Sequence, residues 1–215
     1  MRTVIALVVL VAAACAPPAA EPFTPVDLSA GGSSPGPAGG SSPDPAGTGP
    51  RVETVQVSPD VQVVVEWPAV TDPDTVGMIE TLRDYRAGSF RAVVTGGEDT
   101  AYHKVFHDEA IMEGYRWVKE FLKQRRSVRG VSRLYALNVV SVFEGKGAEL
   151  RACVDETGMR LLDAETGKAV RRQPDWTRSP FLQIVGLQRG DDGIWRIKLL
   201  EHADPFSEGA KGCLR

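Results

Sequence analysis

The sequence is poor in the residues and motifs that usually reveal chemistry directly. It has three cysteines and three histidines among 215 residues, and its cysteines do not form the closely spaced pairs of a zinc site. It contains neither a glycine-rich phosphate loop nor a nucleophile elbow. The apolar run at the amino terminus, Val4 to Ala14, is shorter than the roughly 20 residues that a membrane-spanning helix needs. These absences weaken the hypothesis of an enzyme without excluding it.

A charge excess is also lacking. Residues 51–215 hold 24 basic and 25 acidic side chains, whereas a nucleic-acid-binding domain normally has a clear basic excess. We therefore expect no nucleic-acid partner.

The first residues are typical of a signal peptide, residues 1–14, with Arg2, an apolar run and small residues before Cys15. Cleavage directly before a cysteine resembles the lipobox of bacterial lipoproteins, which implies a lipid on Cys15 and a place on the extracytoplasmic face of the cell membrane. The lipobox prefers Leu where this chain has Ala12, and Ala12-Ala13-Ala14 also fits an ordinary cleavage site. Secretion without a lipid is therefore the alternative.

Residues 15–50 form the expected linker after the signal peptide. Gly, Ser and Pro fill 16 of the 20 positions from 31 to 50, so this stretch cannot bury a core. Such a chain is a flexible tether that spans roughly 30–35 Å. The composition predicts a disordered spacer between a membrane anchor and a folded domain.

The remaining residues predict one α+β domain. Residues 51–71 alternate Val with polar residues and are expected to be an extended lead-in or an edge strand, and the domain proper is expected over 72–215. Helical spacing predicts a helix that starts at Asp72 or Asp74 and a second one from about Asp99. The first helix has one largely apolar stripe, made of Ile79, Leu82, Arg86, Phe90 and Val93. Alternation after Gly130 predicts a meandering antiparallel sheet, in which Trp195, Ile197 and Leu199 face the same way. Helices followed by such a sheet are typical of an α+β domain with the helices on one face.

Three segments of this sheet region, "ELRACVDETG", "DAETGKAV" and "DDGIWRIKLLE", together with a late cysteine, resemble the nuclear-transport-factor-2-like (SnoaL-like) domains of short lipoproteins from high-GC Gram-positive bacteria. The similarity covers about residues 72–215. It implies a cone-like fold, with a cavity between the helices and a curved sheet.

Cys153 lies in the strand "AELRACVDE", where alternation places Ala148, Leu150, Ala152 and Val154 on one face and Cys153 on the other. Its expected partner is Cys213, with the end of the chain folded over the outer face of the sheet. Two free thiols are the alternative, which is less typical of an exported protein.

Three polar motifs favour structural interpretations. His103 and His107 are four residues apart beside Asp108 and Glu109, but we expect them at the solvated margin of a helix and predict no metal or cofactor site. "RGDDG", residues 189–193, is expected to be a hairpin turn and not an adhesion motif. "KQRRSVRG", residues 123–130, is expected to complement a helix dipole, and contact with anionic lipid is the alternative.

The function expected from the sequence is a non-catalytic ligand-binding or accessory module whose partner is a small apolar ligand or an envelope protein. The alternative is an acid/base enzyme, because the resemblance includes ketosteroid isomerases and SnoaL-like cyclases, which place a carboxylate and polar partners in the cavity. Candidate polar residues for such a cavity are Tyr85, Tyr135, Asp163 and His202, but none of them matches a catalytic motif.

Overall fold

The computed structural model describes residues 50–215, and the expected signal peptide, Cys15 and almost all of the linker lie outside the described residues. The described chain begins with a hairpin of strands β1 (Arg51–Ser58) and β2 (Val61–Trp67). Val61, Val63 and Val65 of β2 are fully buried. Residues 51–67, expected to be an extended lead-in or an edge strand, are therefore two strands of its sheet, with β1 at the edge.

Helix α1 (Pro73–Val94) begins where the sequence predicts it. Asp72 is the N-cap and accepts a hydrogen bond from the Thr75 backbone N–H at 2.8 Å, and Pro73 fits the first helical position because its missing N–H has no helical partner there. The predicted apolar stripe is buried throughout. Gly88 does not end the helix, and a Cβ there would lie 2.8 Å from Tyr102 Cβ, so glycine allows the following segment to cross α1 closely.

The second predicted helix is interrupted. The structure has short 3₁₀ helices η1 (Ala101–Val105) and η2 (Asp108–Ala110), followed by α2 (Ile111–Lys123). Between the 3₁₀ helices, Phe106 is extended and forms a bridge with Ile197, and the His107 N–H donates to the Ile197 carbonyl at 2.9 Å. A helix continuing through this point would lose these contacts with the edge of the sheet, so tertiary pairing interrupts the helical pattern.

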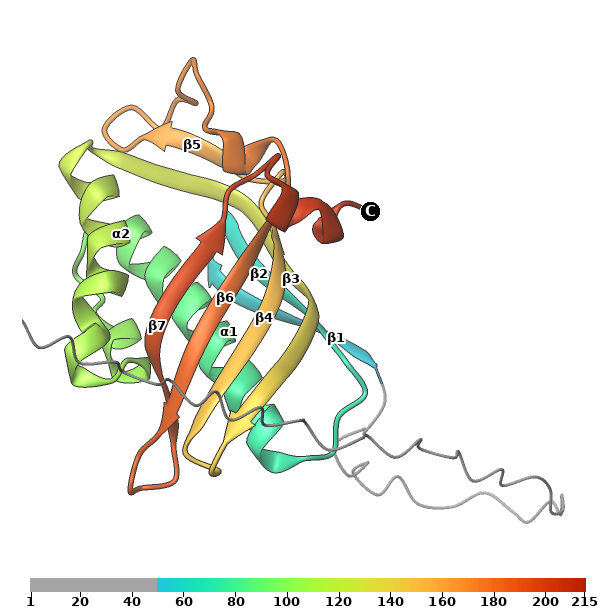
Figure 1. The fold of residues 1–215 in the computed structure, drawn as a ribbon. Helices are drawn as coiled ribbons and strands as arrows, with labels where there is room; N and C mark the ends of the chain where they lie inside the picture. The colour runs from blue at the N-terminus through green and yellow to red at the C-terminus, as the bar shows by residue number, and fades with distance from the viewer. Residues whose placement is uncertain (1–49) are drawn as a thin grey trace, which may run out of the picture. The chain divides into compact units, whose positions relative to one another are not determined.

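The sheet has the order β1-β2-β3-β4-β6-β7 (Figure 1). Its later strands are β3 (Arg126–Phe143), β4 (Gly147–Asp155), β5 (Arg160–Asp163), β6 (Phe181–Arg189) and β7 (Trp195–Ala203), and β5 pairs with β3 outside the main order. The strands after Gly130 pair antiparallel with one another, as expected, but β2 of the expected lead-in is parallel to β3. Parallel neighbours need a long crossover connection, and α1 and α2 supply it.

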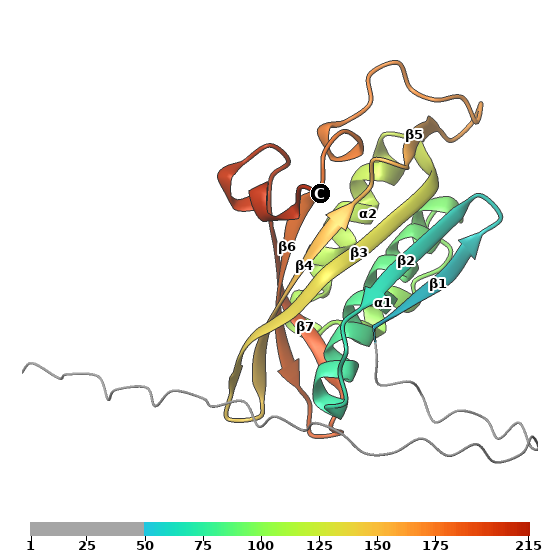
Figure 2. The ribbon, with the colours of Figure 1, turned by 90° about the vertical axis from the view of Figure 1, so that its right-hand side faces the viewer.

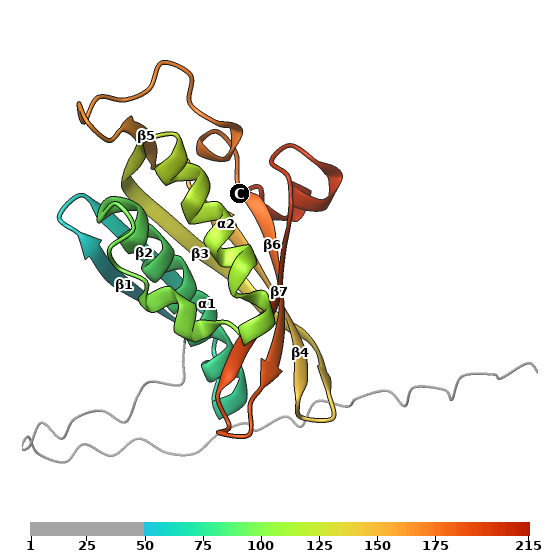
Figure 3. The ribbon, with the colours of Figure 1, turned by 90° about the vertical axis from the view of Figure 1, so that its left-hand side faces the viewer.

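The helices cover one face of this curved sheet, as the cone-like fold implies (Figure 3). Curvature is concentrated in β3, whose pairing with β4 shifts register between Tyr135 and Asn138 and again between Val139 and Ser141. Each irregularity increases the local twist and bends the strand. The first half of β3 can thereby pair with β2 and β5, while its second half continues only with β4.

A bulge also corrects one prediction in β7. Trp195 and Ile197 are buried as expected, but Leu199 is 42% exposed. The β6–β7 register shifts between Gly186 and Leu187, which pair with Leu199 and Ile197 respectively. The extra residue on β7 reverses the alternation beyond it, so Leu200 faces the core in place of Leu199.

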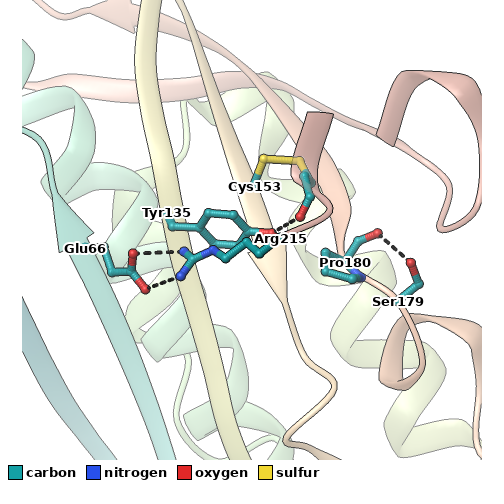
Figure 4. Close-up of a disulfide and its surroundings, with 7 residues drawn as sticks. Glu66, Tyr135, Cys153, Ser179, Pro180 and Arg215 are labelled. Atoms are coloured by element: carbon teal, nitrogen blue, oxygen red, sulfur yellow. Dashed lines mark hydrogen bonds and ion pairs between the residues drawn. A yellow bond between two sulfur atoms is a disulfide. The ribbon is translucent and has the colours of Figure 1, made fainter. Parts of the chain in front are cut away.

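The outer face of the sheet holds the end of the chain (Figure 4). Cys153 is bonded to Cys213, the pairing expected from the sequence, with 5.3 Å between their Cα atoms. The Tyr135 hydroxyl donates to the Cys213 carbonyl, and the Arg215 guanidinium lies 3.5 Å from the centre of the Tyr135 ring. Arg215 also donates to both carboxylate oxygens of Glu66, at 3.0 and 2.8 Å. The 3₁₀ helix η4 (Glu208–Cys213) is thus fixed against the sheet.

Candidate cavity between the helices and the sheet

A cavity of about 1010 Å³ opens between the helices, the inner face of the sheet and the segment that follows β5. This size is at the upper end of the range for sites that enclose small molecules. Helices α1 and α2, strands β6 and β7 and the short 3₁₀ helix η3 (Asp175–Thr177) all contribute side chains. Those used below are Tyr85, Arg86, Glu113, Trp117, Glu120, Phe121, Glu156, Asp175, Trp176, Phe181, Gln183, Leu200 and His202.

One wall of the cavity is aromatic. Trp117 and Phe121 lie four residues apart on α2 and therefore on the same face of the helix, with their ring centroids 4.5 Å apart. Trp176 of η3 continues the row, 6.4 Å from Phe121. Phe90 of α1 supports Trp117 from behind through an edge-to-face contact at 5.5 Å. All three wall residues are partly buried, so they offer apolar area to a ligand.

The floor of the cavity contains a buried ion pair. Arg86 Nη1 lies 3.3 Å from Glu156 Oε1, and both side chains are only 4% exposed. The Ser132 hydroxyl donates to Glu156 at 3.2 Å, and Arg86 Nη2 donates to Gln183 Oε1 at 3.4 Å. Gln183 in turn donates to the Glu201 carbonyl at 2.6 Å. The two charges are therefore held in a network that joins α1 to β3, to the residue that follows β4, and to β6 and β7.

Burial and pairing change the pKa of Glu156 in opposite directions. Loss of hydration is the largest effect and raises the pKa of its carboxyl group, while Arg86 and the Ser132 hydrogen bond lower it. The net direction is upward, because in a nearly dry site the missing hydration outweighs one imperfect ion pair. Burial also raises the pKa of Tyr85 to about 12, so its phenol stays neutral at physiological pH.

The four candidate polar residues do not converge. Tyr85 and His202 line the cavity, and His202 pairs with Asp204 at 3.3 Å on the exposed rim. Tyr135 lies on the opposite face of the sheet under Arg215. Asp163 ends β5 and accepts hydrogen bonds from the Thr166 N–H and hydroxyl at 2.9 and 2.8 Å, which lower the pKa of its carboxyl group. Asp163 is thus a turn residue.

The sequence analysis missed Glu156 and Gln183 and placed Arg86 only within an apolar stripe. That position was the available signal, because a charged residue on a core-facing stripe needs a buried partner. Glu156 carried no comparable signal, since it directly follows β4 in what reads as a turn. Only the approach of α1 to the end of β4 identifies the pair.

The structure also places two of the three polar motifs. His103 belongs to η1 and His107 follows it in extended conformation, so they do not share a helical face. Within residues 50–215 no group of three or more His, Cys, Asp and Glu side chains is arranged to hold a metal ion. "RGDDG" forms the β6–β7 turn, where Gly193 has a φ of 78°. The Arg196 hydrogen bond is the largest of the effects that lower the pKa of Asp192 to about 2.

No helix among the described residues is both long and apolar enough to cross a membrane.

Comparisons with known proteins find similarity in fold only. No protein-family model and no curated protein matches the chain. Among solved structures, it is similar to the intermembrane-space region of the chloroplast protein ARC6, at 13% identity, with 61% of this chain and 98% of that one covered and a TM-score of 0.43.

Two further similar structures have enzyme names. One is a candidate ketosteroid isomerase from Shewanella frigidimarina, at 10% identity, with 59% of this chain and 94% of that one covered and a TM-score of 0.30. The other is a candidate polyketide cyclase from Xanthomonas campestris, at 11% identity, with 60% and 90% covered and a TM-score of 0.34. Likenesses at this level assign no activity to the chain.

Proposed function

We propose that residues 51–215 form a ligand-binding module, held on the extracytoplasmic face of a membrane by a lipid on Cys15. The cavity takes one small, largely apolar molecule. The observation that carries this proposal is an aromatic-walled cavity of about 1010 Å³ whose most deeply buried charges already have protein partners.

Contact area is what the cavity offers most readily. A ligand lying against Trp117, Phe121 and Trp176 would remove apolar surface from water on both sides of the contact, and each square ångström buried contributes about 25 cal/mol. Arg86 and Glu156 need no ligand to compensate their charges, because each has the other as its partner. Glu113, Glu120 and Asp175 make the rim polar, which suits a ligand with an apolar body and a polar end.

Binding is tested with a neutral fluorescent probe, N-phenyl-1-naphthylamine, added to the full chain. The expected result is saturable binding with a blue-shifted emission, weakened about tenfold or more by Phe121→Ala combined with Trp176→Ala, because each substitution removes a large aromatic contact. Phe143→Ala is the matched control, since Phe143 is 65% exposed on β3 and lies outside the cavity. Equal binding by wild type, wall variant and control would place the probe elsewhere and refute the cavity as its site.

The membrane anchor is tested separately. A short apolar run that ends in Ala-Ala-Ala-Cys supports it. Labelled palmitate should enter the wild-type chain but not Cys15→Ser, and only the wild type should remain with the membrane. Recovery of both from the medium in equal amounts would contradict the anchor and leave the cavity proposal standing.

An acid/base enzyme is the second candidate, and Glu156 favours it. Its carboxyl group lines the cavity, and burial raises its pKa, as a general base that works near neutral pH requires. In that case Glu156→Gln would abolish turnover of an isomerase- or cyclase-type substrate while the probe still bound. For a binding module, Glu156→Gln changes probe affinity little and no turnover is found in either protein.

A further inference from the structure

Arg126 is a cation of the cavity lining that lies outside the buried network of the floor. It is the first residue of β3 and belongs to the basic run of residues 123–130. Its side chain lines the cavity and is 31% exposed. The end of α2, the beginning of β3 and β5 lie together at this place (Figure 2). The basic run thus contributes one positive charge to the cavity.

Strand pairing directs Arg126 to the cavity side. In the antiparallel pair of β3 and β5, Arg126 is opposite Asp163 and Val128 is opposite Leu161. Residues opposite each other, and residues two apart on one strand, share a face. Arg126 and Leu161 therefore leave the same face of this strand pair, and both line the cavity. The chain reaches Arg126 directly from the last turn of α2, which carries Phe121 of the aromatic wall.

The guanidinium of Arg126 has no hydrogen bond within the described residues. Its ion pair with Asp163 joins Nη1 to Oδ2 at 3.9 Å, which is too long for a hydrogen bond. Its Nε is buried without a partner. Nε and Nη2 form an edge through which a guanidinium can bind a carboxylate by two parallel hydrogen bonds, and Asp163 approaches the other nitrogen. A buried donor without an acceptor costs free energy, and a ligand in the cavity can supply the acceptor.

The acids of the lining differ from Arg126, because each already contacts a donor of the protein. Acids outnumber arginines in the lining by five to three, so the number of charges alone would favour a cationic ligand. Glu156 has its partner in the floor. The four acids of the rim have these partners: Glu113 the Leu200 N–H at 3.2 Å, Glu120 the Gln124 amide at 2.5 Å, Asp175 Arg178 at 3.2 Å and Asp204 His202 at 3.3 Å. A cationic ligand would have to compete with these partners, whereas an anionic one would meet unused donors.

We propose that the cavity binds an amphiphile with one carboxylate, an inference that rests on the proposed binding module. Its apolar chain lies against the aromatic wall of Trp117, Phe121 and Trp176, and its carboxylate binds Arg126. One cation with Asp163 beside it suits a single negative charge better than the charge of nearly two on a phosphate monoester. The rings give affinity for any apolar chain. A charge-assisted hydrogen bond is about twice as strong as a neutral one, so Arg126 selects an acid over an alcohol of the same chain length.

The test compares decanoic acid, decanol and decyltrimethylammonium, which share one chain length and differ in the charge of the polar end. Each is added to the full chain at pH 8, below the concentration at which it forms micelles, and its displacement of N-phenyl-1-naphthylamine gives its Kd. Decanoate should bind the wild type about tenfold more tightly than decanol, because it alone forms charge-assisted bonds with Arg126. Decyltrimethylammonium should bind more weakly than decanoate.

Substitutions at Arg126 separate the charge from the apolar wall. Arg126→Gln should weaken decanoate binding about tenfold and leave the Kd of decanol and of the probe nearly unchanged. Arg126→Lys should give an intermediate Kd for decanoate, since lysine keeps the charge but lacks the planar fork. Arg129→Gln is the matched control, because it removes the same charge from an exposed residue of β3 that is not part of the cavity lining. Unchanged probe binding in each variant shows that the fold and the cavity are intact.

Three results would overturn the carboxylate while probe binding leaves the binding module standing. Decanoate could bind the wild type no more tightly than decanol, or more weakly than decyltrimethylammonium. Arg126→Gln and Arg129→Gln could weaken decanoate equally. Arg116→Gln could weaken it in place of Arg126→Gln, which would put the polar end on the exposed edge of α2. Failure of the probe and of all three ligands to bind would refute the proposed function itself.

Discussion

Replacing Arg86 with Met tests whether the ion pair in the cavity floor behaves as a buried charge pair. Met keeps an unbranched apolar side chain in place of the arginine stem but leaves Glu156 without its cation. Removing one partner of a buried pair costs about 3–5 kcal/mol, because the remaining charge stays dehydrated. In a domain of this size about 4 kcal/mol lowers Tm by about 8–16 °C.

The stability lost in Arg86→Met should depend on pH. The protonation of the Glu156 carboxyl group sets the direction of this dependence. Burial already raises the pKa of Glu156 above its ordinary 4.5, and loss of Arg86 raises it further. A carboxyl group whose pKa is higher in the folded than in the unfolded state stabilises the fold at pH values below its unfolded-state pKa. This contribution is lost as the pH rises through the pKa of the folded state. The deficit of Arg86→Met should therefore be small near pH 4.5 and grow toward pH 8.

Adding Glu156→Gln to Arg86→Met should restore most of the lost stability at pH 8, because no charge then remains buried. Glu156→Gln alone should also destabilise the fold, because it leaves the Arg86 cation buried without its carboxylate partner. Urea unfolding of the four proteins at pH 4.5, 6 and 8 measures each free energy difference. A deficit in Arg86→Met that is the same at every pH, and that Glu156→Gln does not relieve, would refute the electrostatic argument and leave lost packing as its cause.

Two further predictions concern stability alone. Cys153→Ala combined with Cys213→Ala removes a disulfide between residues 60 apart in sequence. The chain-entropy relation predicts that the free energy of unfolding, measured in urea, falls by about 4 kcal/mol. A loss below about 1 kcal/mol would mean that the contacts of Tyr135 and Arg215 suffice to hold the tail. Gly88→Ala should destabilise by about 1–3 kcal/mol, although alanine is the better helix former, because its Cβ would lie 2.8 Å from Tyr102 Cβ. Thermal unfolding measures this change, and an increase in Tm would show that the crossing has room to relax.

Local patterns were reliable where one physical requirement dominates. The apolar stripe of α1 and the alternation of β4 were right because burying an amphipathic face requires a fixed period, and both faces of β4 lie as expected. The outward position of Cys153 followed from that period, and so did its pairing with the only other cysteine of the described chain.

Predictions failed where distant segments changed a local pattern. The helix expected from Asp99 is interrupted because Phe106 pairs with Ile197, and Leu199 turns outward because one extra residue enters β7. Neither pairing can be predicted from the residues of its own segment. The parallel contact between β2 and β3 was invisible for the same reason, since it joins strands separated by the helices.

Composition and period by themselves determined the α+β class and the faces of the main strands, because each depends on residues close together in sequence. The tertiary structure alone decided what the molecule presents to partners. It brought Arg86 to Glu156 in the cavity floor and moved Tyr135 to the outer face. It also placed Arg126 and Leu161 on one face of the β3–β5 pair, at the cavity. Such meetings depend on strand register and on how closely a helix approaches the sheet, and both are set by the packing of the whole chain.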